Sequence, residues 1–209
     1  MRRLAALLLL AATPAFAGVE GVYRLEGVRE AASGLELTAD GHFRYGLTYG
    51  ALDEVGEGRW VRDGNRILLT TEPAWTAPVF EAVSAERSAE FPLRVQVTGP
   101  DGSPMSWPVD VILTLAEGHE VQGHTQSYGY MPSLGEGIRV TSLRLGLGVF
   151  DFLSAPFPVD LARANDLTFR LVPNSLGQPP FKGQPLLIEG DDLVMLRGGD
   201  RLTYRKQSE

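Results

Sequence analysis

The sequence predicts an all-β protein, in which a small up-and-down barrel formed by the N- and C-terminal segments carries an inserted β-sandwich-like module. The 24 glycines and 14 prolines are spread over the 209 residues, and no long amphipathic helical pattern persists between them. Short runs that alternate apolar and polar side chains recur between turn signals, which is typical of β-strands. Five such runs lie near the N-terminus and three near the C-terminus, and about eight strands can close a small barrel.

The five N-terminal strands are expected over GVYRLEG, LELTA, HFRYGLTY, GRWVR and RILLTT. Asp40-Gly41 and Asp63-Gly64-Asn65 supply the tight turns of two hairpins, because these residue types tolerate positive φ. Side chains two residues apart share a face of a strand, so Phe43, Tyr45 and Tyr49 are expected on one side. This apolar face must be covered by other strands.

The C-terminal sequence QPLLIEGDDLVMLRGGDRLTYRK, residues 184–206, supplies the cover. It divides into three short strands at Glu189-Gly190-Asp191-Asp192 and at Gly198-Gly199-Asp200. With the five N-terminal strands, these complete the eight strands of the predicted barrel.

The chain changes character between these two parts. Residues 72–92 are rich in Ala, Pro and Glu and predict a connection with one short strand or helix. Residues 93–172 alternate strands and turn signals again, the last strand starting at Asp166. We therefore assign 18–92 and 173–209 to the barrel and 93–172 to the inserted module, since insertions are tolerated where chain ends lie close together. One continuous sandwich is the alternative.

The first 17 residues have the three parts of a secretory signal peptide. Arg2 and Arg3 precede the apolar run Leu4–Ala12, and Ala15-Phe16-Ala17 places small residues at a cleavage site. The run is about half as long as the roughly 20 residues that span a bilayer. We expect cleavage near Ala17-Gly18, a mature chain without a membrane span, and export to the periplasm or beyond.

Composition excludes several classes of partner. The chain has no cysteine, so it forms no disulfide and carries no lipid-modified cysteine. Its formal charge is -7, which becomes -9 once Arg2 and Arg3 leave with the leader. Basic residues do not cluster beyond Arg205-Lys206, whereas nucleic acids and anionic lipids require a concentrated positive surface. We expect neither partner.

Three stretches resemble known families. GVYRL with LELTADGHFRYGLTYGALDEVGEGRWVRDGNRILLT is similar to lipocalin-like β-barrel domains of secreted proteins in Gram-negative bacteria. LRVQVTGPDGSPMSWPVDVILTLAEGHEVQGHTQSYGY resembles transthyretin-like or carboxypeptidase-regulatory-like β modules, although Trp107-Pro108 departs from their pattern. With the return DLARANDLTFRLVPNSLGQPPF, the whole resembles uncharacterised exported bacterial proteins. The resemblance implies a barrel with a β module and transfers no catalytic residue.

The usual signatures of catalysis are missing, so we expect a non-enzymatic protein without a cofactor. The sequence has no Gly-x-Ser-x-Gly turn for a serine nucleophile and no glycine-rich phosphate loop. The alternative is a hydrolase that cleaves carbohydrate or peptide with loop carboxylates, since a glycosidase needs two carboxyl groups across its substrate. Asp53, Glu54 and Glu57 in the predicted loop GALDEVGEG, and Asp191-Asp192, are its candidates. Acidic residues are also common in turns.

The stretch EGHEVQGH supplies weak candidate metal ligands, His119, Glu120 and His124. Imidazole and carboxylate groups suit zinc or copper. On a continuous strand, however, His119 and His124 would face opposite sides, and a bulge at Gly123 would be needed to bring them together. A solvated hairpin is the competing interpretation.

The aromatic residues are the remaining candidates for binding. Six are expected to line the barrel interior: Tyr23, Phe43, Tyr45, Tyr49, Trp60 and Tyr204. They could hold a small apolar ligand, or they could be ordinary core. The apolar segment 145–161 is either a buried strand and return loop or an exposed partner surface. We expect an exported binding or structural protein of the cell envelope that holds a small apolar ligand or a protein partner.

Overall fold

The computed structural model describes residues 18–135 and 137–208, and the expected leader, residues 1–17, lies outside them. The protein is all-β, as predicted, and one 3₁₀ turn, Gly148–Phe150, is the helical element of the described part. No helix within these residues is long and apolar enough to cross a membrane. The chain forms two compact units. The first contains residues up to Leu47, Val55–Pro73 and the residues from Pro180 onward, and the second contains the rest.

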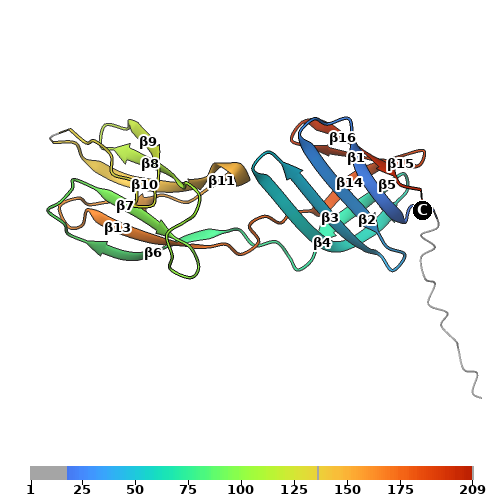
Figure 1. Ribbon diagram of the computed structural model, residues 1–209, viewed down its shortest axis with the longest axis horizontal. Coiled ribbons are helices and arrows are strands. Elements are labelled where there is room, and N and C mark those ends of the chain that lie inside the picture. The colour runs from blue at the N-terminus through green and yellow to red at the C-terminus, as the bar shows by residue number, and fades with distance from the viewer. Residues whose placement is uncertain (1–17, 136, 209) are drawn as a thin grey trace, which may run out of the picture. The chain divides into compact units, whose positions relative to one another are not determined.

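The first unit is a closed barrel of eight strands, and each strand pairs with its two neighbours in the order β1-β16-β15-β14-β5-β4-β3-β2 (Figure 1). The N-terminal strands are β1 (Gly21–Glu26), β2 (Ala31–Leu37), β3 (His42–Tyr49), β4 (Leu52–Asp63) and β5 (Arg66–Thr71). The C-terminal strands are β14 (Lys182–Glu189), β15 (Asp192–Arg197) and β16 (Asp200–Lys206). The predicted barrel of five plus three strands is confirmed.

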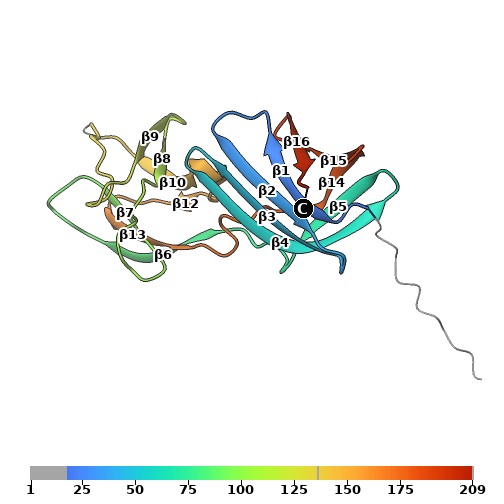
Figure 2. The same ribbon diagram turned by 45° about the vertical axis from the view of Figure 1, so that its right-hand side comes forward.

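Pairing between the first and last strands closes the barrel. β1 and β16 run antiparallel, with Tyr23 opposite Lys206 and Leu25 opposite Tyr204, and Figure 2 shows the two strands side by side. Closure leaves no free sheet edge in this unit, which removes a route to aggregation. The N-terminal and C-terminal strands therefore belong to one continuous sheet, and their apolar side chains are buried on its inner face.

The stretch GALDEVGEG was predicted to be a loop. This prediction is wrong, because β4 runs through the stretch from Leu52 onward. Gly56 and Gly58 are both buried on the inward face of this strand, and a side chain would not fit at Gly58. A Cβ at Gly58 would lie 2.1 Å from the backbone oxygen of Thr70 and 2.9 Å from the ring of Phe43. Glycine here permits a close approach between strands and does not mark a turn.

The second unit contains two sheets around a separate apolar core. One sheet has the order β6-β13-β7, and the other has the order β11-β10-β8-β9, with β12 also paired to β10 (Figures 1 and 2). The strands are β6 (Val79–Glu86), β7 (Arg94–Thr98), β8 (Asp110–Leu115), β9 (Glu120–His124), β10 (Val140–Leu147), β11 (Phe152–Leu153), β12 (Phe157–Pro158) and β13 (Asp166–Val172). The β-sandwich-like module is thus present.

The expected connection, residues 72–92, carries β6. This strand pairs with β13 and belongs to the second unit, which begins at Ala74 in this part of the chain and ends at Pro179. The sequence-based boundaries were 92/93 and 172/173. Only Phe80 is buried along β6, so the strand carries no alternating pattern of large apolar side chains.

The apolar segment 145–161 forms the end of β10 and the return strands β11 and β12. Leu145 and Leu147 are buried, and Phe152 and Phe157 are partly buried against the same core. The segment is therefore mainly core and return loop, and its alternate residues reach solvent.

Candidate functional site

Five of the six aromatic candidates lie in the barrel core. Tyr23, Phe43, Tyr45, Trp60 and Tyr204 are each no more than 2% exposed and belong to one cluster of buried residues. Tyr49 differs, because it lies at the end of β3 beside the hairpin turn, is 55% exposed and is not among the residues of that cluster.

Polar atoms of these side chains bond to the barrel itself. The Tyr23 hydroxyl donates to the carbonyl of Val19 at 2.7 Å. The indole Nε1 of Trp60 donates to the carbonyl of Thr38 at 3.0 Å. A buried polar group without a partner costs free energy, so these bonds are what allow the rings to be core residues.

A second polar group surrounds Tyr45. Nη1 of Arg197 donates to the Tyr45 hydroxyl at 3.1 Å, and the guanidinium carbon lies 5.8 Å from the ring centre of Phe181. The rings of Tyr45 and Phe181 meet edge to face at 5.1 Å. Sequence reasoning missed both Arg197 and Phe181, because one ends a strand and the other lies in the Pro/Gly-rich return. Together they close the space beside Tyr45.

The interior keeps its phenols neutral. Burial, followed by the charges of Glu20, Asp191 and Asp192, raises the pKa of Tyr23 to about 12. Burial, followed by the neighbouring Tyr45 phenol, raises the pKa of Tyr204 above its ordinary value. Desolvation disfavours a phenolate in such a site. These groups can donate hydrogen bonds, but they are poor bases at neutral pH.

The weak metal candidates do not converge. β9 pairs with β8 in unbroken register from Glu120 to His124, so the bulge that would unite the ligands is not formed. The ring of Tyr130 fills the space beside Gly123, where an added Cβ would lie 2.3 Å from it. Glu120 pairs with Arg144 at 2.7 Å. In the part of the chain that the structure describes, no three His, Asp or Glu side chains are grouped to hold a metal ion.

The candidate carboxylates are also dispersed. Asp53 and Glu57 lie on the exposed face of β4, whereas Glu54 lies on the opposite face and is 8% exposed. Asp191 is in the turn before β15, and the Asp192 carboxylate lies 3.9 Å from Nε of Arg205. Because neighbouring residues of a strand point to opposite faces, Asp53 and Glu54 cannot flank one substrate bond.

A hollow of about 420 Å³ on the barrel unit contains an Asp-His pair that sequence reasoning had not combined. The His42 Nδ1 lies 3.1 Å from a carboxylate oxygen of Asp40, and its Nε2 lies 2.8 Å from Nη1 of Arg59. Arginine only donates, so Nε2 accepts and the proton resides on Nδ1. Hydrogen bonds from Thr38 and then from His42 hold the pKa of Asp40 below its ordinary value. Because Arg59 occupies Nε2, the imidazole presents no free nitrogen to a nucleophile.

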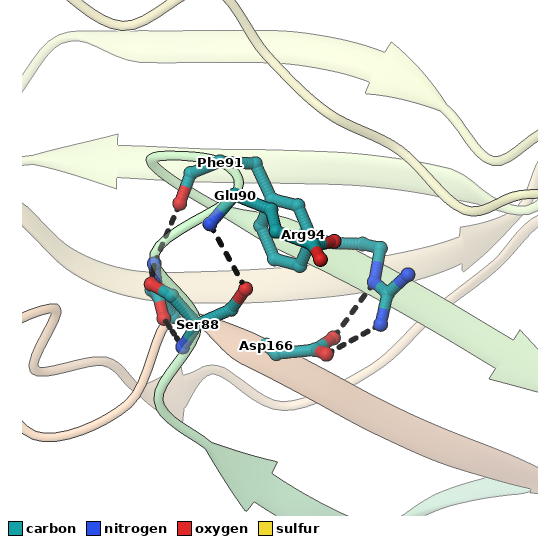
Figure 3. Close-up of polar contacts among 6 residues, drawn as sticks. Ser88, Glu90, Phe91, Arg94 and Asp166 are labelled. Atoms are coloured by element: carbon teal, nitrogen blue, oxygen red, sulfur yellow. Dashed lines mark hydrogen bonds and ion pairs between the residues drawn. The ribbon is translucent and has the colours of Figure 1, made fainter.

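The second unit contains a buried polar network around the loop before β7 (Figure 3). Nε and Nη2 of Arg94 donate to the two carboxylate oxygens of Asp166 at 2.9 and 2.5 Å. The Arg94 guanidinium also lies 4.6 Å over the ring of Phe91. Two parallel bonds of this kind fix geometry as well as adding energy.

Asn165 holds the same loop closed. Its Oδ1 accepts from the Ser88 N–H at 2.8 Å, and its Nδ2 donates to the carbonyls of Ser88 and Phe91 at 3.0 and 2.7 Å. The side chain is 2% exposed, so the network is satisfied internally. Both polar atoms of the Asn165 side chain are thus used to position the loop.

The chain matches no protein family, and searches of curated proteins and of solved structures find no match. The function is therefore inferred from the geometry and the sequence.

Proposed function

We propose that this chain is an exported, non-enzymatic binding protein of the cell envelope, and that its barrel is a rigid scaffold. The observation that supports the proposal is that the side chains inside the barrel pack against one another and satisfy their hydrogen bonds within the barrel. Its aromatic side chains contact one another, and the phenol and indole groups of Tyr23, Tyr45, Trp60 and Tyr204 bond to the barrel's own atoms. A scaffold of this kind supports binding on its surface.

The export part of the proposal is supported by the leader pattern of residues 1–17. The test is fractionation of the native host after expression from the natural start. We expect the protein in the periplasm or the medium, with an N-terminus near Gly18. A protein that stays in the cytoplasm with Met1 or Arg2 at its N-terminus would refute it.

The non-enzymatic part is supported by the dispersed carboxylates and the occupied His42. The purified protein is tested against broad panels of glycoside and peptide substrates, together with the triple variant Asp53→Asn, Glu54→Gln, Glu57→Gln. We expect no turnover from either protein. Turnover by the natural chain that the triple variant loses would establish the hydrolase alternative.

Binding on the protein surface is favoured over a small apolar ligand inside the barrel. An apolar ligand needs a lined void, whereas Phe43, Tyr45 and Phe181 pack their rings against one another in the interior. A fluorescent apolar probe should therefore show no saturable binding to the mature protein. Saturable binding that the Phe181→Ala substitution alters would show instead that the protein binds an apolar ligand inside the barrel.

A further inference from the structure

Two neighbouring loops of the second unit expose large side chains that serve no visible core role. Trp107, in the β7–β8 loop, is 48% exposed, and Tyr128 and Met131, after β9, are 59% and 45% exposed. Single exposed apolar residues are ordinary, but a group of them on adjoining loops marks an interaction surface. We name Trp107, Tyr128 and Met131 the aromatic loop surface.

Backbone hydrogen bonds place the two loops side by side. Thr125 bonds to Val109 through both its backbone N–H and its hydroxyl, which joins the loops at their base. Farther out, both loops bond to the edge of β7 that does not pair with β13. The Met105 N–H donates to the carbonyl of Val97, and Tyr130 exchanges two backbone bonds with Val95. Trp107 lies between the anchors at 105 and 109, and Tyr128 lies between those at 125 and 130.

Internal hydrogen bonds also constrain both loops. Gln126 and Gly129 exchange two backbone bonds around Tyr128, and a Cβ at Gly129 would lie 2.9 Å from the carbonyl oxygen of Val95. In the other loop, Asp101 accepts from both the N–H and the hydroxyl of Ser103. A constrained surface loses less conformational entropy when it binds, which favours affinity.

The chemistry of the surface is neutral and rich in hydroxyl and amide groups. Asp101 is the single charged residue of 99–109, and residues 125–135 have none, in a chain of formal charge -7. The same two loops carry exposed polar side chains: Ser103, Ser106, Gln126, Ser127 and Ser133. The partner must therefore combine apolar patches with many uncharged hydrogen-bonding groups.

Neutral sugars meet this description better than proteins do. Protein interfaces are enriched in Arg and depleted in Ser, whereas the two loops, residues 99–109 and 125–135, contain no Arg and several Ser residues. A pyranose ring presents an apolar C–H face that can lie on an aromatic ring, and its hydroxyls can bond to Ser and Gln. Tyr and Trp, which are apolar with one polar tip, suit such a ligand.

We propose that the aromatic loop surface binds a neutral polysaccharide, with Trp107 and Tyr128 as stacking platforms. The proposal rests on the proposed role as an exported binding protein and adds a class of ligand to it. Since a neutral ligand carries no charge for Asp101 to attract or repel, the interaction should be nearly insensitive to salt.

The test is affinity electrophoresis of the full mature chain through gels that contain soluble neutral glucans or galactomannan, with sedimentation on chitin and cellulose. We expect retardation by at least one polysaccharide, unchanged when the salt concentration is raised about tenfold. Trp107→Ala and Tyr128→Ala should each weaken the association at least about tenfold. Tyr49→Ala is the matched control, because it removes an equally exposed tyrosine outside the two loops, and it should bind like the natural chain.

Three outcomes would overturn the proposal: no retardation by any neutral polysaccharide, retardation that survives both loop substitutions, or self-association that Trp107→Ala abolishes without any sugar binding. Unfolding midpoints of the variants verify that they are folded. A mature protein that is exported and inert toward hydrolase substrates, yet binds no polysaccharide, would refute this inference alone. A cytoplasmic or hydrolytic protein would refute the proposed function.

Discussion

The hydroxyl of Tyr204 lies 2.9 Å from Oγ of Ser33, a residue 171 positions earlier in the chain. Ser33 donates its single proton to the carbonyl of Gly46 at 2.6 Å, so Tyr204 must be the donor in the first bond. This relay joins β16, β2 and β3 inside the barrel. The ends of the chain are thus linked by side chains as well as by the β1–β16 ladder.

The buried phenols predict a loss of stability at alkaline pH. Tyr23 ionises near 10 when unfolded, whereas burial raises its pKa to about 12 in the folded protein. Between these values the unfolded chain releases a proton that the folded chain retains, so the free energy of unfolding falls as the pH rises. The stabilisation is complete below pH 10 and is lost from 10 to 12. Denaturant unfolding across this range measures it.

Tyr23→Phe is the control for this effect. It removes the ionisable group and the bond to Val19, which costs about 1 kcal/mol at neutral pH. Because the variant has one fewer group to titrate, its free energy of unfolding should fall less steeply above pH 10. Equal slopes for the two proteins would show that Tyr23 does not carry the effect.

Trp60→Ala should lower the free energy of unfolding by about 3–5 kcal/mol, because it empties a fully buried site in the barrel core. Trp60 is 1% exposed. Urea or guanidinium melts measure the change. A loss below about 1 kcal/mol would mean that the packing around the indole contributes little.

Gly58→Ala should destabilise the barrel by about 1–3 kcal/mol through overpacking. The new methyl group would lie 2.1 Å from the Thr70 carbonyl oxygen and 2.8 Å from the Glu72 nitrogen, and neither backbone atom can move freely. Gly34→Ala, in β2, is the matched control, because its nearest neighbour is the Tyr23 oxygen at an ordinary 3.8 Å. If both substitutions have the same small effect on the free energy of unfolding, the close contact at Gly58 does not limit the size of the side chain there.

Asn165→Ala should lower the stability of the second unit by roughly 2–4 kcal/mol, since it strips partners from the backbone of Ser88 and Phe91 at a buried site. Hydrogen exchange of the Ser88 amide, which Asn165 now protects, should accelerate. Asn165→Asp keeps the acceptor for that amide but loses both donors, so it should retain part of the protection. Unchanged exchange in the alanine variant would contradict the role given to Asn165.

The barrel was predictable from the sequence because its strands have one apolar face and one polar face. Apolar and polar side chains alternate in residues 42–49 and 66–71, and this pattern indicated strands directly. The Asp40-Gly41 turn indicated a hairpin, and the three C-terminal runs brought the number of expected strands to eight. Two features were not visible. β4 extends through Gly58, where glycine permits a close approach to Phe43 and Thr70, and β6 buries only Phe80 and so lacks an alternating apolar pattern.

The candidate site was less predictable. Tyr23, Trp60 and Tyr204 are buried in the barrel core, whereas Tyr49 extends beyond that core because β3 continues to the hairpin turn. The Arg94–Asp166 pair spans 72 residues, and the contact between Arg197 and Tyr45 spans 152. Such contacts depend on strand pairing, which periodicity alone does not specify.

Native mass spectrometry of the protein purified from its own host tests the central claim, that an exported chain uses a self-filled barrel as a scaffold. We predict the mass of a chain that begins near Gly18, with no small molecule retained in gentle conditions. A bound apolar compound released on unfolding, or a chain that still begins at Met1, would contradict it.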